Sequence, residues 1–185
     1  SYLSGHRLVG EAMADPAVLG FVRAFLDEVL PTVPTVPGVD LLTYRNTLVE
    51  RFSNPHIKDT LLRLAEDGSV KLQTTMRPVL LEKVAAGEGF ETMALAIGGW
   101  IRFMTGVDES GAVIDGLKDP QGGTRLIELA TTVVAAPDKH TVRPFLQEFL
   151  GNEVASSDAA VEAITAAVVA INNEGTKPLL VRRYA

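Results

Sequence analysis

The sequence predicts an all-α fold, and three observations lead to this prediction. Apolar residues recur at intervals of three and four along almost every segment, as they do on one face of an α-helix. Prolines, glycines and helix-capping side chains separate these segments. No segment shows the strict alternation of apolar and polar residues that is typical of a half-buried strand. We therefore expect a single helical domain over residues 1–185.

The first strongly marked helix follows Asp15, which is a good N-cap, and Pro16, which suits the first helical turn. Its apolar face continues to Val29. Three prolines at three-residue intervals in residues 31–38 favour an extended, polyproline-like connection. Asp40 is expected to cap the next helix. The buried stripe expected for that helix consists of Leu41, Tyr44, Leu48 and Phe52.

Asn54-Pro55 repeats the combination of a cap and a proline, so the sequence predicts another helix that starts there and ends at Asp67-Gly68. A further helix is expected over residues 71–86, and Pro78 inside it predicts a kink or a break, because proline lacks the N–H of a helix interior. The apolar face of the first of these two helices would consist of Ile57, Leu61, Leu64 and Ala65.

A longer helix is expected from Phe90 to Met104, and it contains the adjacent pair Gly98-Gly99. Each glycine weakens a helix by about 1 kcal/mol relative to alanine. We interpret the pair as a place where another backbone approaches closely. Residues 106–123 are rich in Gly and Asp and predict a long loop, of a length that is often functional or contact-forming. The spacing of its acidic residues does not match a calcium-binding loop.

Helices are expected to resume after this loop, and the chain ends in an apolar and then basic segment, residues 177–185. We expect this tail to be an extended segment laid on the body of the domain or a contact with a partner. The three helices expected before it cover residues 124–135, 138–150 and 157–173.

The composition argues against several classes of function. The formal charge is −6, from 17 Lys and Arg against 23 Asp and Glu, and no dense basic run interrupts the acidic excess. We therefore expect no binding to nucleic acid or to an anionic membrane surface. There is no cysteine, and the three histidines are far apart, so no metal site is expected. No apolar run approaches the roughly 20 residues needed to span a bilayer, and no signal peptide opens the chain, so we expect a soluble, cytoplasmic protein.

The motifs of several enzyme classes are missing from the sequence. There is no G-x-G-x-x-G dinucleotide fingerprint, no G-x-x-x-x-G-K-[ST] loop, no G-x-S-x-G and no H-E-x-x-H. Neighbouring carboxylates such as Asp108 and Glu109 would point in different directions on a helix. From its residues alone, the chain contains no complete active site.

Two cations flank the Asp67-Gly68 turn and give rise to two hypotheses. In the first, Arg63 forms an i, i+4 ion pair with Asp59, and Lys71 is solvated. In the second, the planar guanidinium and the flexible ammonium together bind several oxygens of a polar substrate. The residue pattern alone leaves both hypotheses open.

Four stretches of the sequence resemble the mannitol dehydrogenase family of long-chain NAD(P)-dependent polyol and hexuronate dehydrogenases. They are "EAMADP" at 11–16, "VPGVDL" at 36–41, "TYRNTLVERFSNPHIKDTLLRLAEDGSVK" at 43–71 and "GVDESG" at 106–111. The resemblance covers essentially the whole chain as the C-terminal domain of that family, and it is densest between residues 11 and 71. It implies a helical domain similar to the C-terminal domain of 6-phosphogluconate dehydrogenase.

The resemblance also implies a parent enzyme with an N-terminal Rossmann-type domain that binds NAD or NADP. The family reaction is a metal-independent hydride transfer between a secondary alcohol and the nicotinamide, with the lysine of a Lys-x4-Asn-x2-His motif as general base. In the family, that motif lies just before the segment that matches residues 1–6. We therefore expect this chain to lack catalytic residues and a cofactor site, and to be inactive in isolation.

By the same resemblance, Arg63 and Lys71 occupy positions that bind substrate hydroxyls or a carboxylate. The expected substrate is a polyol or a sugar acid, of the mannitol/fructose or mannonate/fructuronate type, and the expected partners are the Rossmann domain and a possible second copy. His56 and "LQTTM" at 72–76 depart from the family pattern, so the sugar stays open, as does the choice between NAD and NADP. The alternative from another class is a non-catalytic helical scaffold or oligomerisation module.

Overall fold

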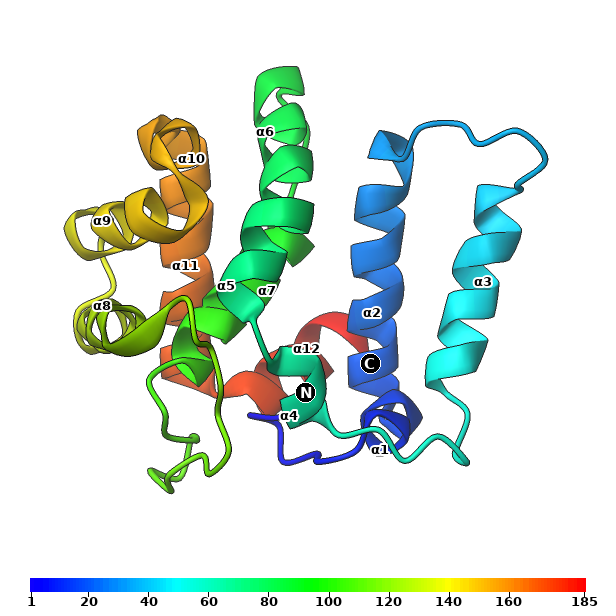
Figure 1. Cartoon of the computed structure of the whole chain (residues 1–185), viewed down its shortest axis with the longest axis horizontal. Coiled ribbons are helices and arrows are strands. Elements are labelled where there is room, and N and C mark those ends of the chain that lie inside the picture. The colour runs from blue at the N-terminus through cyan, green and yellow to red at the C-terminus, as the bar shows by residue number, and fades with distance from the viewer.

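The computed structural model describes all 185 residues and consists of helices joined by turns and loops (Figure 1). There is no β-sheet, and β-pairing is limited to two isolated bridges, Leu8 with Thr60 and Val107 with Val113. The all-α prediction is therefore confirmed. The helices are α1 (Val9–Ala14), α2 (Pro16–Val29), α3 (Leu41–Phe52), α4 (Leu61–Ala65), α5 (Gly68–Lys71), α6 (Arg77–Ala86), α7 (Glu91–Phe103), α8 (Gly123–Ala135), α9 (Lys139–Leu150), α10 (Asn152–Ser156), α11 (Asp158–Glu174) and α12 (Thr176–Tyr184). None of them is both long enough and apolar enough to cross a membrane.

The centre of the molecule is the contact between α7 and α11, around which α8, α9 and α10 are packed (Figure 1). Gly98 lies in this contact, where an added Cβ would be 3.0 Å from the Cβ of Ala167 and 3.3 Å from the backbone N of Val168. This agrees with the expectation that another backbone approaches closely at this position. Two residues further along α7, the ring of Trp100 packs edge-on against Phe145 and Phe149 of α9.

The predictions for the starts of α2 and α3 are confirmed. The side chain of Asp15 accepts a hydrogen bond from the N–H of Ala17 at 2.9 Å. Asp40 accepts from the N–H groups of Leu42 and Thr43 at 2.9 and 3.1 Å. The connection between the two helices begins with a short 3₁₀ turn, Leu30–Thr32. The two helices stand side by side as a hairpin at one edge of the molecule (Figure 1).

The apolar stripe expected on α3 is covered only in part: Leu41, Tyr44 and Leu48 line a groove against α2. Tyr44 is 53% exposed and Phe52 is 44% exposed, and the one buried residue of the helix is Val49. These side chains are exposed because α3 lies at the edge of the molecule (Figure 1). Its main neighbours are α1 and α2, and they cover only a narrow line of its side chains.

The expectation of a helix that starts at Asn54-Pro55 is also wrong. The side chain of Asn54 accepts from the N–H of His56 at 3.0 Å, and this closes a turn without starting a helix. The following residues run beside the N-terminal segment, where the N–H of Val9 donates to the carbonyl of Asp59 at 2.9 Å. Because this pairing keeps the chain extended, α4 starts only at Leu61, with the side chain of Thr60 as its cap.

The tail is a helix, α12, and the expectation of an extended segment is corrected. Its apolar residues Leu179 and Leu180 are buried, and the helix packs along α2. The contact with α2 is so close that a Cβ on Gly20 would lie 2.1 Å from the carbonyl oxygen of Tyr184. Pro178 falls in the first turn, where a missing N–H costs no hydrogen bond.

Carboxylates from distant parts of the chain cap three of the helices. Glu28 on α2 accepts from the first N–H groups of α7, those of Thr92 and Met93, at 2.8 Å each. Glu109 accepts from the N–H of Thr176 at the start of α12, at 2.6 Å. A third carboxylate caps α5 and is described with the site below. A carboxylate at a helix N-terminus accepts hydrogen bonds from N–H groups that have no partner within the helix. Its negative charge also interacts favourably with the positive end of the helix dipole.

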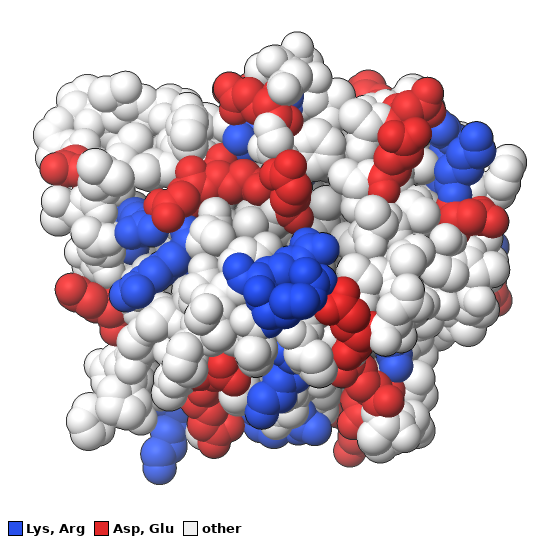
Figure 2. Space-filling model, turned by 180° about the vertical axis from the view of Figure 1, so that it is seen from behind, with Lys and Arg blue, Asp and Glu red and all other residues white.

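On one face of the molecule, charged side chains of both signs lie next to one another (Figure 2). On the face seen from behind, Lys and Arg side chains border Asp and Glu side chains, with uncharged surface between them (Figure 2). The expectation that the chain does not bind nucleic acid stays a prediction.

The two adjacent glycines of α7 provide a test of the α7–α11 contact. An added Cβ on Gly99 meets nothing within 4 Å, so Gly99→Ala should stabilise the fold by about 0.5–1 kcal/mol through helix propensity. Gly98→Ala gains the same propensity but presses on Ala167, and we expect it to be less stable than Gly99→Ala by about 1 kcal/mol or more. Urea unfolding of the two variants measures this difference, and equal midpoints would contradict the packing described here.

Candidate functional site

The two cations singled out in the sequence lie at the turn between α4 and α5, and we call residues 59–71 the α4–α5 corner. Helix α4 ends at Ala65, and Asp67 then adopts the left-handed conformation with φ 54°, before α5 begins at Gly68. A short polar side chain such as that of Asp tolerates this conformation better than most others. The predicted stop of the helix at Asp67-Gly68 is therefore close to the observed end of α4.

The glycine of this turn is required by a close approach to α7. An added Cβ on Gly68 would lie 2.4 Å from Nε1 of Trp100, and the Trp100 ring is itself held by two phenylalanines of α9. The indole Nε1 is buried and has no hydrogen-bond partner. The start of α5 is thus pressed directly against the centre of the fold.

A buried carboxylate fixes the next residue of the turn. Asp119, from the long loop after α7, accepts from the backbone N–H of Ser69 at 2.7 Å and from its hydroxyl at 2.5 Å. It also accepts from the N–H of Gly122 at 3.1 Å, which closes its own loop. Asp119 is 8% exposed and Ser69 is 2% exposed. The loop and the α4–α5 corner are therefore clamped together, and the N–H of Asp67 adds a bond to the carbonyl of Lys118 at 3.3 Å.

Lys71 reaches back over the turn toward the helix that carries Arg63. Its ammonium donates to the carbonyl oxygens of Leu64 at 2.9 Å and Glu66 at 2.5 Å. These carbonyls belong to the C-terminal end of α4, where a cation also meets the negative end of the helix dipole. The side chain is exposed, and no carboxylate is among its hydrogen-bond partners.

Arg63 forms the ion pair that the first of the two sequence hypotheses describes. Its Nε donates to Oδ1 of Asp59 at 2.6 Å, and its Nη2 donates to Oδ2 of the same carboxylate, which makes a two-pronged pair. These hydrogen bonds hold the pKa of Asp59 below its ordinary value and raise the pKa of Arg63. The Arg63 side chain is 65% exposed and that of Asp59 is 20% exposed. The remaining N–H groups of the guanidinium make no hydrogen bond within the chain.

Lys71 is followed directly by a π-helical turn, Leu72–Met76, which falls on the "LQTTM" stretch. The hydroxyl of Thr75 donates to the carbonyl of Lys71 at 2.5 Å. Helix α6 follows at Arg77 without a gap, with Pro78 in its first turn. The irregularity expected near this proline is therefore a π-helical turn, and the helix is not broken. Single π-helical turns inside helices occur frequently at functional sites.

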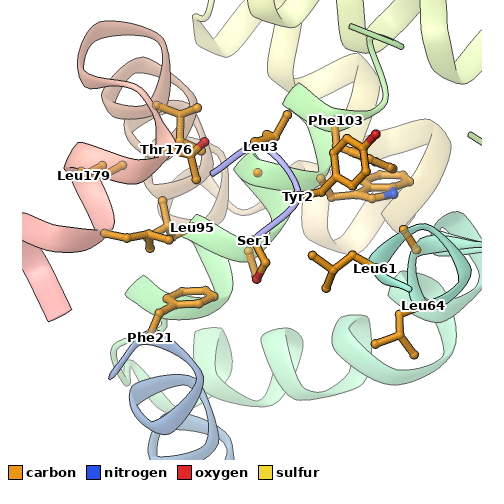
Figure 3. A pocket seen from close by; sticks show the side chains of 16 residues that line it. Ser1, Tyr2, Leu3, Phe21, Leu61, Leu64, Leu95, Phe103, Thr176 and Leu179 are labelled. Carbon is orange, nitrogen blue, oxygen red and sulfur yellow. The ribbon is translucent and has the colours of Figure 1, made fainter. Parts of the chain in front are cut away.

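An apolar cavity of about 330 Å³ lies on the other side of α4 (Figure 3). Figure 3 shows side chains that converge on it from the N-terminal segment, α2, α4, α7 and α12. Leu61 and Leu64 of α4 line it, whereas Arg63 and Lys71 do not. The lining is mostly apolar and contains no charged side chain. The sequence analysis missed this cavity, because its lining comes from segments far apart in the chain.

The structure brings together no candidate metal site. No group of three or more His, Cys, Asp or Glu side chains is arranged to hold a metal ion.

Comparison with known proteins identifies the family. The model of the mannitol dehydrogenase C-terminal domain matches residues 1–172. A mannitol dehydrogenase of Saccharomyces cerevisiae is 36% identical over 66% of this chain and 25% of its own length. The mannitol 2-dehydrogenase of Pyricularia oryzae is 30% identical over 94% of this chain and 34% of its own length.

Two solved structures share the fold. The mannitol 2-dehydrogenase of Pseudomonas fluorescens, solved as a ternary complex with NAD and D-mannitol, has a TM-score of 0.86 and 31% identity over 98% of this chain and 36% of that chain. A D-sorbitol dehydrogenase in substrate-free form has a TM-score of 0.83 and 25% identity over 97% of this chain and 36% of that chain.

The fold is thus that of the C-terminal helical domain of mannitol dehydrogenases. The chain is a member of the mannitol dehydrogenase C-terminal domain family. It spans about a third or less of the length of these relatives.

The clamp between Asp119 and Ser69 makes a direct prediction. Asp119→Asn replaces an accepting oxygen by an NH₂ group that would face N–H or O–H donors, so we expect a loss of stability of about 1–3 kcal/mol. Asp115→Asn, on the exposed part of the same loop, is the matched control and should leave the urea midpoint unchanged. Equal midpoints for the two variants would show that the clamp does not stabilise the corner.

Proposed function

We propose that this chain is the substrate-binding domain of an NAD(P)-dependent polyol or sugar-acid dehydrogenase, in which Arg63 and Lys71 bind oxygens of the substrate. The observation that carries the proposal is that both cations stand on one clamped corner of a member of this family. The contact of Gly68 with Trp100 and the bonds of Ser69 to Asp119 keep this corner rigid. A rigid support reduces the entropy that is lost when a flexible substrate is held in position.

The two side chains retain donors for a ligand. The ammonium of Lys71 has two carbonyl partners, which leaves one of its N–H groups. The guanidinium of Arg63 uses only the edge formed by Nε and one N–H of Nη2 for Asp59. Charged N–H donors of this kind form strong hydrogen bonds to hydroxyl and carbonyl oxygens.

Dinucleotide pyrophosphates bind at the free N-terminus of a helix that follows a strand. This chain has no such strand-to-helix turn, because it contains no strand. The N–H groups at the starts of α5, α7 and α12 donate to carboxylates of the chain itself, those of Asp119, Glu28 and Glu109. We therefore propose that NAD or NADP is bound by an N-terminal Rossmann-type domain of the parent enzyme. That domain would supply the hydride acceptor and the lysine general base of the Lys-x4-Asn-x2-His motif.

The comparisons favour polyol over sugar acid as the substrate class. The relatives named above are mannitol and sorbitol dehydrogenases, and the Pseudomonas fluorescens protein was solved with NAD and D-mannitol. We propose the oxidation of a polyol such as mannitol to the ketose and the reverse reduction of the ketose. Residues of this domain would position the sugar chain while the proton moves to a base on the other domain.

The alternative role as an association module, and pairing with a second copy, stay predictions. The surface available for association includes an apolar groove between α2 and α3, which is lined by Val33, Val36, Val39 and Tyr44 among others. Light scattering of the 185-residue chain tests this role, and a monomer at all concentrations would argue against it.

The substrate role of the two cations is tested in the complete dehydrogenase, with its cofactor domain. We expect Arg63→Ala and Lys71→Ala each to lower kcat/KM for fructose roughly 10-fold or more, because a charged hydrogen bond to the substrate is lost. Arg125→Ala removes an exposed arginine that is ion-paired on α8 and should leave kcat/KM unchanged. Urea midpoints close to that of the wild type would exclude unfolding as the cause. Unchanged kcat/KM in both variants would remove the α4–α5 corner from the site.

A further inference from the structure

The α4–α5 corner and its clamp carry charges of both signs. Residues 59–71 contain two cations and three carboxylates, the latter being Asp59, Glu66 and Asp67. The loop adds Lys118, whose ammonium lies 3.6 Å from the carboxylate of Glu66, and Asp119, which binds Ser69. Three cations therefore stand against four carboxylates, and the formal charge of the corner with its clamp is −1.

The strongest of these contacts is the two-pronged pair between Asp59 and Arg63. Both oxygens of Asp59 accept from the same edge of the guanidinium, so the pair fixes the plane of the guanidinium as well as its charge. Asp59 lies in the extended segment before α4, and its backbone carbonyl accepts a hydrogen bond from the N–H of Val9. This bond holds the backbone from which the carboxylate of Asp59 extends. Four-fifths of its side chain surface is covered.

We infer that Asp59 is a positioning and specificity-determining residue, which holds Arg63 in place and makes the corner suited to an uncharged polyol or ketose rather than a sugar acid. This inference rests on the proposed function, because it assumes that Arg63 contacts the substrate. Asp59 is the residue that would set the preference for a polyol over a sugar acid.

The preference for an uncharged substrate follows from the way in which the Asp59–Arg63 ion pair interacts with a hydroxyl and with a carboxylate. A substrate hydroxyl takes a hydrogen bond from the outer N–H groups of Arg63 and carries no charge that Asp59 could repel. A substrate carboxylate would be attracted by Arg63 and repelled by Asp59 on the far edge of the guanidinium, so that the net attraction is reduced. To pair fully with Arg63, it would have to displace Asp59.

The two lysines of the corner differ in their partners. The ammonium of Lys118 faces Glu66, whereas that of Lys71 is directed to two backbone carbonyls of the turn and keeps its charge and one N–H for a ligand. Asp67 brings a further carboxylate at the surface. A polyol can use the donors and the acceptors of the corner alike.

The test is a change of substrate preference in the complete dehydrogenase, measured as kcat/KM for fructuronate divided by kcat/KM for fructose. Asp59→Asn keeps the size of the side chain and removes its charge, so we expect this ratio to rise at least about fivefold. Asp59→Glu restores the charge and should bring the ratio back toward the wild-type value. The double variant Asp59→Asn with Arg63→Ala should lose the rise, because the uncompensated cation is then absent.

Asp27→Asn is the matched control. Asp27 forms a comparable ion pair with Arg45 at 2.6 Å, on α2 and α3, and its loss should not move the ratio. A purely structural role of Asp59 would lower both kcat/KM values together and leave the ratio unchanged. An unchanged ratio in an Asp59→Asn variant that folds like the wild type overturns the inference.

The outcome for the wild type separates this inference from the proposed function. If the wild-type enzyme reduces no ketose, the proposed function fails, and the inference fails with it. If it reduces fructose but the ratio does not respond to Asp59→Asn, only the inference fails. A rise in the ratio that persists in the double variant would also overturn it, since Arg63 would then not be the cation that Asp59 controls.

Discussion

The geometry of the candidate site depends on one buried carboxylate, that of Asp119. It binds the N–H and the hydroxyl of Ser69 and so joins the long loop after α7 to the first turn of α5. On the opposite side of the same turn, Gly68 lies against Trp100. Held from two sides, the turn directs Lys71 back onto the end of α4, and α4 in turn carries Arg63. The positions of both cations therefore follow from contacts made by the residues between them.

The same kind of interaction ties the rest of the domain together. Glu28 caps α7 and Glu109 caps α12, each with backbone N–H groups more than 60 residues away. Within "GVDESG" at residues 106–111, Glu109 caps α12, and Asp108 closes its own loop by accepting from Ser110 and Ala112. These carboxylates organise the backbone. Several acidic residues of this chain therefore stabilise its helices. For this reason the net negative charge of the chain does not indicate an acidic binding surface.

The sequence predicted the start of a helix correctly where a residue next to that start caps it. It failed where contacts with residues far away in the sequence determine whether a helix forms. Asp15 and Asp40 cap α2 and α3 as expected. Asn54 has the same side-chain chemistry, but pairing of residues 59–61 with the N-terminal segment keeps the chain extended there. The helical tail depends on Glu109, which no local pattern reveals. For the site, the pattern left Arg63 and Lys71 undecided, and only the resemblance to the family favoured a substrate role. The partner of Asp119, fifty residues away, could not be read from spacing at all.

We propose that the clamped α4–α5 corner contacts the sugar in the parent dehydrogenase, and a crystal structure of that enzyme with its cofactor and a polyol would show this contact. We expect substrate oxygens within hydrogen-bond distance of Nζ of Lys71 and of the outer N–H groups of Arg63, with Asp59 still paired to that guanidinium. A polyol bound with both cations more than a hydrogen bond away, and with the Asp119–Ser69 clamp intact, would contradict it.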